Sequence, residues 1–293
     1  MKHSRHLAKL RRGATATAAL AAATASLLFA GSAPAGAAGT SAQSSVTHYV
    51  ALGDSYAAGV GLTPVRNAAC GRTSGSYPAW IAATYKPAVY KDVTCSGATT
   101  RSLWNWEGTA APQVNALTKD TDLVTVTLGG NDLGFTDVLT TCVLAGLTTK
   151  EGTPCRDKEA ADVDAAFAKL SSRLPDMLAD IKLRSPRARV LVVGYPNLFP
   201  DDGALCGASA PLAKGDITWL NQTTSRLNFM LEFSAYLKQA EFIDTAKLFQ
   251  GKDMCRAPGA WINPLLPVTP GSAHPTAFGQ LVIAEEAYNR MGN

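Results

Sequence analysis

Hydrophobic residues in this chain gather in short runs rich in valine and leucine, separated by longer segments in which apolar positions recur at helical spacing. A short, continuous apolar run that stops at a glycine is typical of a buried strand. Strands are predicted over residues 46–52, 123–128 and 189–193, with a weaker one over residues 241–243. Each of the first three is followed at once by a glycine.

The segments between these strands predict helices. The helices are expected over residues 77–85, 160–183, 217–237 and 275–290. Pro78 and Pro275 stand in the first turns of their helices, where the missing proline N–H removes no intrahelical hydrogen bond. Pro175 lies inside the second helix, where a proline can kink the backbone.

Alternating strands and helices of this kind predict an α/β fold with a parallel sheet covered by helices on both faces. In open sheets of this type, ligands bind at the carboxyl ends of the strands. Ser55 and Asn131 both follow a predicted strand end closely. We therefore expect a functional site at this edge of the sheet.

The first 38 residues have the layout of a secretory signal peptide. A head with five lysines and arginines precedes a stretch rich in alanine and leucine over residues 14–31, and small residues suited to cleavage follow. We expect residues 1–38 to be removed and residues 39–293 to form one secreted domain. A retained membrane anchor is the alternative, and it fits an alanine-rich segment less well. Arg11 and Arg12 fit a twin-arginine signal poorly.

Removing this segment changes the charge of the chain. The remaining residues carry 22 Lys/Arg against 23 Asp/Glu, so the formal charge moves from +4 to −1. The basic character of the precursor therefore gives no reason to expect nucleic-acid binding.

No second apolar segment is long enough to span a bilayer. We expect a protein without stable membrane insertion, and a monomer.

Six cysteines remain in the mature chain, and an even number in an exported protein favours disulfides. Sequence order favours the pairs Cys70–Cys95, Cys142–Cys155 and Cys206–Cys255, although other connectivities stay open. Zinc ligation is the competing interpretation, disfavoured because Cys-x-x-Cys is absent and histidine is scarce. Phosphate-binding glycine loops are absent as well. No metal and no cofactor are therefore expected.

Ser55 and His274 are a candidate pair for nucleophilic acyl transfer, which needs a hydroxyl and a general base. Ser55 lies between Gly53, which permits a tight turn, and the start of a short helix, whose N–H groups can face negative charge. The alternative is that Ser55 only caps this helix. The mature chain has two histidines, and His48 is expected to be an ordinary surface residue in front of the predicted sheet. His274 follows a flexible segment and introduces the last helix.

Two further turns carry groups suited to an oxyanion. Asn131, in Gly129-Gly130-Asn131-Asp132, can donate through its side-chain amide, and Gly97 allows a backbone N–H to approach a ligand. Each turn alone is also common as a plain turn.

Taken together and in this order, the four stretches resemble the SGNH (GDSL-type) hydrolase superfamily, in particular its secreted actinobacterial esterase/lipase branch. The resemblance rests on Gly53-Asp54-Ser55, Gly97, Gly130-Asn131-Asp132, and His274-Pro275 with Gly279. It implies a flavodoxin-like three-layer α/β/α sandwich with a five-stranded parallel sheet. It also implies Ser55 as nucleophile, His274 as general base, and an oxyanion hole formed by the N–H groups of Ser55 and Gly97 and the side chain of Asn131.

The chain departs from the family pattern at two positions. Tyr56 stands where leucine is usual, and Gly271 stands three residues before His274, where an aspartate is usual. We expect a backbone carbonyl, from Gly271 or Ser272, to orient His274; a distant carboxylate is the alternative. A neutral carbonyl stabilises imidazolium less than a carboxylate does.

The expected function is that of a secreted carboxylic ester hydrolase that cleaves lipid or short-chain acyl esters. The alternatives are a non-catalytic carbohydrate- or lipid-binding module and a polysaccharide deacetylase; lipase and phospholipase activity both stay open. A serine peptidase is disfavoured, and the Gly-x-Ser-x-Gly elbow is absent. Apolar residues near the motifs either line an acyl groove or pack in the core: Trp104, Trp106, Phe135, Leu144 and Leu147.

Overall fold

The computed structural model describes residues 46–292, which fold around a five-stranded parallel sheet with the strand order β4-β1-β5-β6-β7. The strands are β1 (His48–Gly53), β4 (Val89–Asp92), β5 (Leu123–Thr127), β6 (Arg189–Val193) and β7 (Glu241–Ile243). The predicted three-layer α/β/α fold is confirmed. The signal-peptide segment, residues 1–38, lies outside the described residues.

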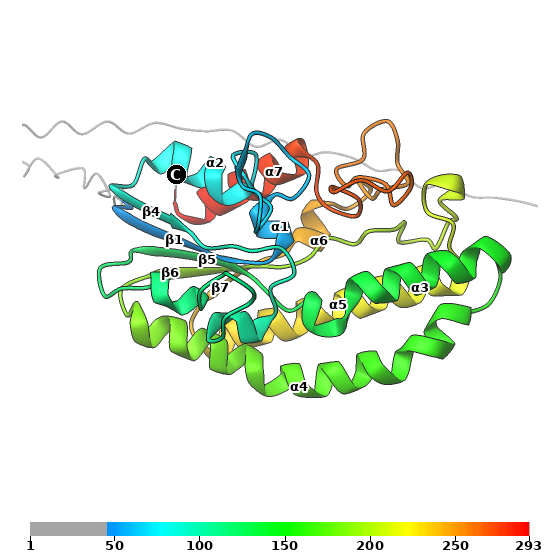
Figure 1. Ribbon diagram of the computed structural model, residues 1–293, viewed down its shortest axis with the longest axis horizontal. Helices are drawn as coiled ribbons and strands as arrows, with labels where there is room; N and C mark the ends of the chain where they lie inside the picture. The colour runs from blue at the N-terminus through cyan, green and yellow to red at the C-terminus, as the bar shows by residue number, and fades with distance from the viewer. Residues whose placement is uncertain (1–45, 293) are drawn as a thin grey trace, which may run out of the picture. The chain divides into compact units, whose positions relative to one another are not determined.

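Helices cover both faces of this sheet (Figure 1). On one face lie α1 (Ser55–Ala58), α2 (Tyr77–Tyr85) and α7 (Ala277–Arg290), and on the other lie α3 (Phe135–Thr148), α4 (Pro154–Arg184) and α5 (Lys214–Leu237). A short α6 (Thr245–Leu248) follows β7, and a small hairpin joins β2 (Val65–Asn67) to β3 (Arg72–Thr73). The 3-10 helices are η1 (Thr100–Leu103), η2 (Gln113–Ala116), η3 (Asn131–Leu133) and η4 (Gly207–Ser209).

Burial explains why the central strands were recognisable in the sequence. All five residues of β5 are buried, and so are all residues of β1 except His48. Both faces of these strands meet helices, so residues on both faces are buried, including Thr125 and Thr127 of β5. On α4 the buried residues keep the helical period: Val163, Phe167, Leu170, Leu174, Met177, Leu178 and Ile181. Each such side chain stabilises the fold by about 1.5–3 kcal/mol relative to exposure. Pro175 lies within α4 without ending it.

The sequence pattern missed strand β4 and helix α3, besides the β2–β3 hairpin, α6 and the 3-10 helices. Strand β4, Val-Tyr-Lys-Asp, is an edge strand that is only half-buried, and it is defined by parallel pairing with β1. Helix α3 is rich in threonine and β-branched residues, which have weak helix propensity, and it is held by packing on α4. His48 proved to be the first residue of β1 and not a residue in front of it.

Disulfides join Cys70 to Cys95, Cys142 to Cys155 and Cys206 to Cys255. These are the pairs that sequence order favours. Within residues 46–292, no helix combines the length and the apolar character that crossing a membrane requires.

Candidate active site

The four candidate segments meet at the carboxyl edge of the sheet. Ser55 is the first residue of α1, directly after β1, and Asn131 begins η3 shortly after β5. Gly97 lies in the loop after β4, and His274 lies in the loop before α7. Because β4, β1 and β5 are neighbours in the sheet, their ends lie side by side. All four residues line the same pocket.

Ser55 and His274 form a hydrogen-bonded pair. His274 Nε2 lies 2.7 Å from Ser55 Oγ, and His274 Nδ1 lies 2.8 Å from the carbonyl oxygen of Ser272. A carbonyl only accepts hydrogen bonds, so Nδ1 carries the proton and Nε2 presents its lone pair to the serine hydroxyl. This is the tautomer that a general base requires.

The interpretation of Ser55 as a mere helix cap is wrong. The N-cap of α1 is Asp54, whose side chain accepts the N–H of Tyr56 at 2.9 Å. The hydroxyl of Ser55 therefore stays available for His274.

The carbonyl that orients His274 belongs to Ser272, which confirms the expectation of a backbone group in place of the usual aspartate. The loop around it is held from two sides. Asn263 donates its N–H to the His274 carbonyl at 2.9 Å and accepts the N–H of Ala273 at 3.1 Å. The Tyr56 hydroxyl donates to the Ala273 carbonyl at 2.6 Å. The tyrosine at the usual leucine position thus helps to fix the histidine loop, a bond that leucine cannot make.

Burial lowers the pKa of His274 below 6.5, and the hydrogen bond to Ser272 opposes this only in part. The imidazole is therefore neutral at neutral pH, as a base must be. As the pH falls from 6.5 through the lowered pKa, the ring becomes protonated, and the contribution of the neutral ring to folding stability is lost over that range.

We expect a titration of the His274 ring by NMR to give a pKa below 6.5. Burial also raises the pKa of the neighbouring Asp54, to about 7. A pH–rate profile would therefore combine the titrations of Asp54 and His274, whereas NMR follows the His274 ring alone. A His48→Gln variant of the protein without its first 38 residues leaves one imidazole and assigns the signal. A His274 pKa at or above 6.5 would contradict the burial argument.

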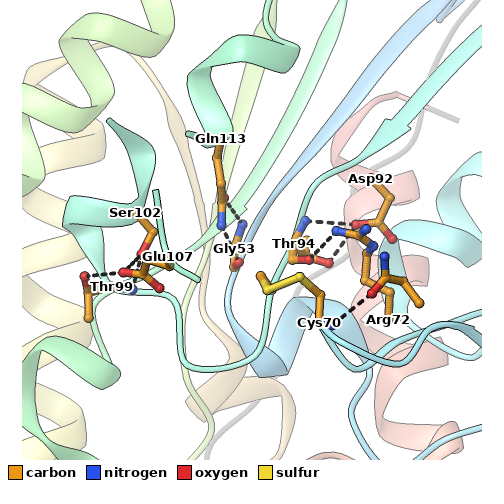
Figure 2. Close-up of a disulfide and its surroundings, with 11 residues drawn as sticks. Gly53, Cys70, Arg72, Asp92, Thr94, Thr99, Ser102, Glu107 and Gln113 are labelled. Carbon is orange, nitrogen blue, oxygen red and sulfur yellow. Dashed lines mark hydrogen bonds between the residues drawn. A yellow bond between two sulfur atoms is a disulfide. The ribbon is translucent and has the colours of Figure 1, made fainter. Parts of the chain in front are cut away.

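The turn that carries Ser55 depends on a glycine and on a buried glutamine. Gly53 has φ +150°, and a Cβ there would lie 2.7 Å from Ala57 Cβ and 2.9 Å from the Thr127 carbonyl oxygen. The Gln113 amide pairs with both backbone groups of Gly53, at 2.8 and 2.9 Å (Figure 2). Gln113 is buried, and the reciprocal pairing satisfies its amide. Its role was not visible in the sequence, because it lies 60 positions from Gly53.

A disulfide fixes the loop that carries Gly97. Cys95 is bonded to Cys70, whose disulfide Figure 2 shows. Cys95 donates its N–H to the Gly53 carbonyl at 2.9 Å. Ser96 donates its N–H to the Cys70 carbonyl at 2.9 Å. Gly97 has φ +82°, and no atom lies within 4 Å of where its Cβ would stand. The Gly97 backbone is therefore open to a ligand.

Asn131 faces this loop from the end of β5. Its side-chain Nδ2 donates to the Ala98 carbonyl at 2.9 Å. The nitrogen carries two hydrogens, so the second can be donated into the pocket. The next residue, Asp132, accepts the N–H and hydroxyl of Thr100 at 2.7 and 2.6 Å and ties the same two segments together.

The pocket in front of these groups has a volume of about 490 Å³ and mostly apolar walls. Phe135 and Leu144 line it, in agreement with one of the two interpretations of the sequence. Trp104, Trp106 and Leu147 do not. Trp104 donates its indole N–H to Asp180 at 2.8 Å, while Trp106 and Leu147 are largely exposed. Closeness in sequence therefore does not bring these three side chains to the pocket, and Trp104 packs against the core, in agreement with the other interpretation.

Ionisable groups are scarce in the pocket. Among its described lining residues, Asp54 and His274 are the only members of the Asp, Glu, His, Lys and Arg types. Within residues 46–292, no group of three or more His, Cys, Asp or Glu side chains is arranged to hold a metal ion. The arrangement suits the attack of a hydroxyl on an apolar substrate with a carbonyl group.

Comparison with known proteins agrees with this chemistry. Residues 51–282 match the model of the GDSL-like Lipase/Acylhydrolase family. Lipase 2 of Streptomyces coelicolor is 38% identical over 255 residues, covering 83% of this chain and 85% of that protein. The lipase of Streptomyces rimosus is 32% identical, covering 80% of this chain and 82% of that protein.

Two solved structures are similar in fold and in sequence. Phospholipase A1 from Streptomyces albidoflavus NA297 has a TM-score of 0.71 and 33% identity, covering 84% of this chain and 100% of that one. The extracellular lipase from Streptomyces rimosus has a TM-score of 0.73 and 31% identity, covering 84% of this chain and 99% of that one.

Proposed function

The chain belongs to the GDSL-like lipase/acylhydrolase family and is a carboxylic ester hydrolase, and we propose that it works through an acyl-enzyme on Ser55 with His274 as general base. The observation that carries this proposal is the 2.7 Å contact between His274 Nε2 and Ser55 Oγ at an open pocket. The Ser272 carbonyl, 2.8 Å from Nδ1, supports the tautomer that the step needs.

In the first half of the reaction, Ser55 Oγ attacks the ester carbonyl while His274 Nε2 takes its proton. The resulting oxyanion accepts hydrogen bonds from the Ser55 and Gly97 N–H groups and the Asn131 amide. His274 then returns the proton to the leaving alcohol, and the acyl group stays on Ser55. In the second half, His274 takes a proton from water as the water attacks the acyl carbonyl. The bond between the acyl carbon and Ser55 Oγ then breaks, His274 returns the proton to Ser55 Oγ, and the acid is released.

The substrate is proposed to be an ester with an apolar acyl group. Support comes from the walls of the pocket, which are mostly apolar and include Leu, Val and Phe side chains, and from the scarcity of charged groups there. Lipid esters fit this lining, and a phospholipid ester is included because one similar structure is that of a phospholipase A1. A polysaccharide deacetylase is less well supported, because sugar hydroxyls need polar partners and the polar share of these walls is small.

We also propose that the protein is secreted, with residues 1–38 removed as a signal peptide and residues 39–293 retained as one hydrolase domain. The basic head and alanine-rich stretch of the sequence support this. So do the three disulfides, which persist in oxidising surroundings. A similar structure is that of an extracellular lipase.

A fluorophosphonate probe tests the proposed function. The phosphorus centre accepts attack by an activated serine only, so we expect one adduct, located at Ser55 by peptide mass spectrometry, together with loss of p-nitrophenyl ester hydrolysis. An adduct on another serine would contradict the assignment. A folded protein that neither reacts with the probe nor hydrolyses the ester would instead favour a non-catalytic binding module.

A further inference from the structure

One tyrosine joins the ends of three neighbouring strands. Tyr195 lies two residues after β6, and its hydroxyl donates to Asp54 Oδ2 at 2.6 Å and accepts the N–H of Gly130 at 3.0 Å. Asp54 directly follows β1, and Gly130 lies in the turn after β5. Strands β1, β5 and β6 are consecutive in the sheet. A single phenol oxygen therefore connects all three strand ends.

The position of this tyrosine is itself fixed. Asn228 on α5 accepts the Tyr195 N–H at 2.8 Å and donates to the Tyr195 carbonyl at 2.7 Å, so both backbone groups are held by one buried side chain. The ring packs edge-on against Tyr56, and it lies so close to Gly130 that a Cβ there would be 3.1 Å from it. Because backbone and ring are both confined, the hydroxyl has little freedom to move.

The direction of these hydrogen bonds is determined by chemistry. A backbone N–H can only donate, so Gly130 occupies a lone pair of the phenol oxygen and the phenol hydrogen goes to Asp54. Burial raises the pKa of Tyr195 well above 10, so the phenol keeps this hydrogen. Asp54 also accepts the Tyr56 N–H, which fixes the carboxyl group from its other side.

We propose that Tyr195 is a positioning residue for ester hydrolysis, whose hydroxyl sets the distance between the nucleophile and the oxyanion donors. Asp54 directly precedes Ser55, and Gly130 directly precedes Asn131. Without the hydroxyl, two buried groups lose a partner and the two turns can separate. The proposal rests on the proposed roles of Ser55 and Asn131. Negative charge on the substrate oxygen develops in the transition state, so a widened oxyanion hole lowers kcat more than it raises KM.

The test compares Tyr195→Phe with Tyr49→Phe. Tyr49 is a matched control, since it is equally buried and its hydroxyl also links β1 to β5, at 2.8 Å from Thr125 Oγ1, but it does not line the pocket. Rates are divided by the number of sites that react with fluorophosphonate. We expect Tyr195→Phe to lower kcat roughly 10- to 100-fold with KM changed less than about threefold. We expect Tyr49→Phe to keep kcat within about twofold, although both variants lose some stability.

A second variant separates the bridge from a general effect on folding. Asp54→Asn keeps an oxygen that can cap α1 but removes the carboxylate that accepts the phenol hydrogen. If both residues act through one bridge, Asp54→Asn also lowers kcat, and the double variant loses little more than the worse single variant. The proposal is wrong if kcat per reactive site is the same in Tyr195→Phe and Tyr49→Phe, or if Asp54→Asn leaves kcat unchanged. It is also wrong if the fold-loss of kcat in the double variant equals the product of the fold-losses in Tyr195→Phe and Asp54→Asn. Failure of the wild-type protein to react with fluorophosphonate would instead overturn the proposed function.

Discussion

Replacing Ser55 with alanine is expected to abolish ester turnover, with kcat falling on the order of 10⁵- to 10⁶-fold. Among residues 46–292, the Ser55 hydroxyl is the one nucleophile that hydrogen-bonds to the His274 ring, so its loss leaves only slow attack by water within the pocket. His274→Ala is expected to cost a similar factor, because an uncharged serine hydroxyl without a base is a weak nucleophile. The double variant should be no worse than either single one. The measurement is p-nitrophenyl butyrate hydrolysis at saturating substrate.

Ser96→Ala is the matched control for this prediction. Ser96 lines the same pocket but is exposed, and its hydroxyl makes no contact with His274. We expect its kcat to stay within about threefold of the wild-type value. Circular dichroism and the melting temperature show whether the Ser55 variant is folded. A folded Ser55→Ala protein with activity near wild type would rule out Ser55 as the nucleophile.

Replacing Asn131 with alanine is expected to lower kcat about 10²- to 10³-fold, which corresponds to roughly 3–4 kcal/mol of transition-state stabilisation. KM should change little, because the neutral carbonyl of the substrate accepts hydrogen bonds more weakly than the oxyanion does. Asn131→Asp should be at least as damaging, since an ionised carboxylate has no hydrogen to donate and repels the oxyanion. Steady-state kinetics on one p-nitrophenyl ester give both constants.

Asn131 also holds the Gly97 loop, because its side chain donates to the Ala98 carbonyl. A control must therefore weaken the contact between the η3 turn and the Gly97 loop without removing a hydrogen-bond donor from the pocket. Thr100→Val does this. It deletes the hydroxyl that donates to Asp132 at 2.6 Å between the same two segments, and Thr100 does not line the pocket. We expect a less stable protein whose kcat stays within about fivefold of wild type. If Thr100→Val and Asn131→Ala lose the same activity, loop position alone explains the Asn131 effect.

Several buried amide and hydroxyl groups of the site could not be found in the sequence. The side-chain amides of Gln113 and Asn228 each hydrogen-bond both backbone groups of one residue, Gly53 and Tyr195 respectively. The Tyr195 hydroxyl hydrogen-bonds both Asp54 and Gly130. In each case the partners are tens of positions apart, and the residue type alone is ordinary for its element. What marks these residues is that a polar side chain is buried. Whether a single position is buried depends on the tertiary structure, so the sequence does not show it.

The sequence by itself determined the buried central strands and the helices α4, α5 and α7. It also determined the four segments that carry Ser55, Gly97, Asn131 and His274. These depend on local periodicity and on short motifs, which a linear chain expresses directly. The tertiary structure alone decided that β4 pairs at the edge, that the carbonyl orienting His274 is that of Ser272 and not that of Gly271, and which apolar side chains line the pocket. These features depend on which distant backbone and side-chain groups come within hydrogen-bond or contact distance, and only the packing of the sheet and its helices fixes those distances.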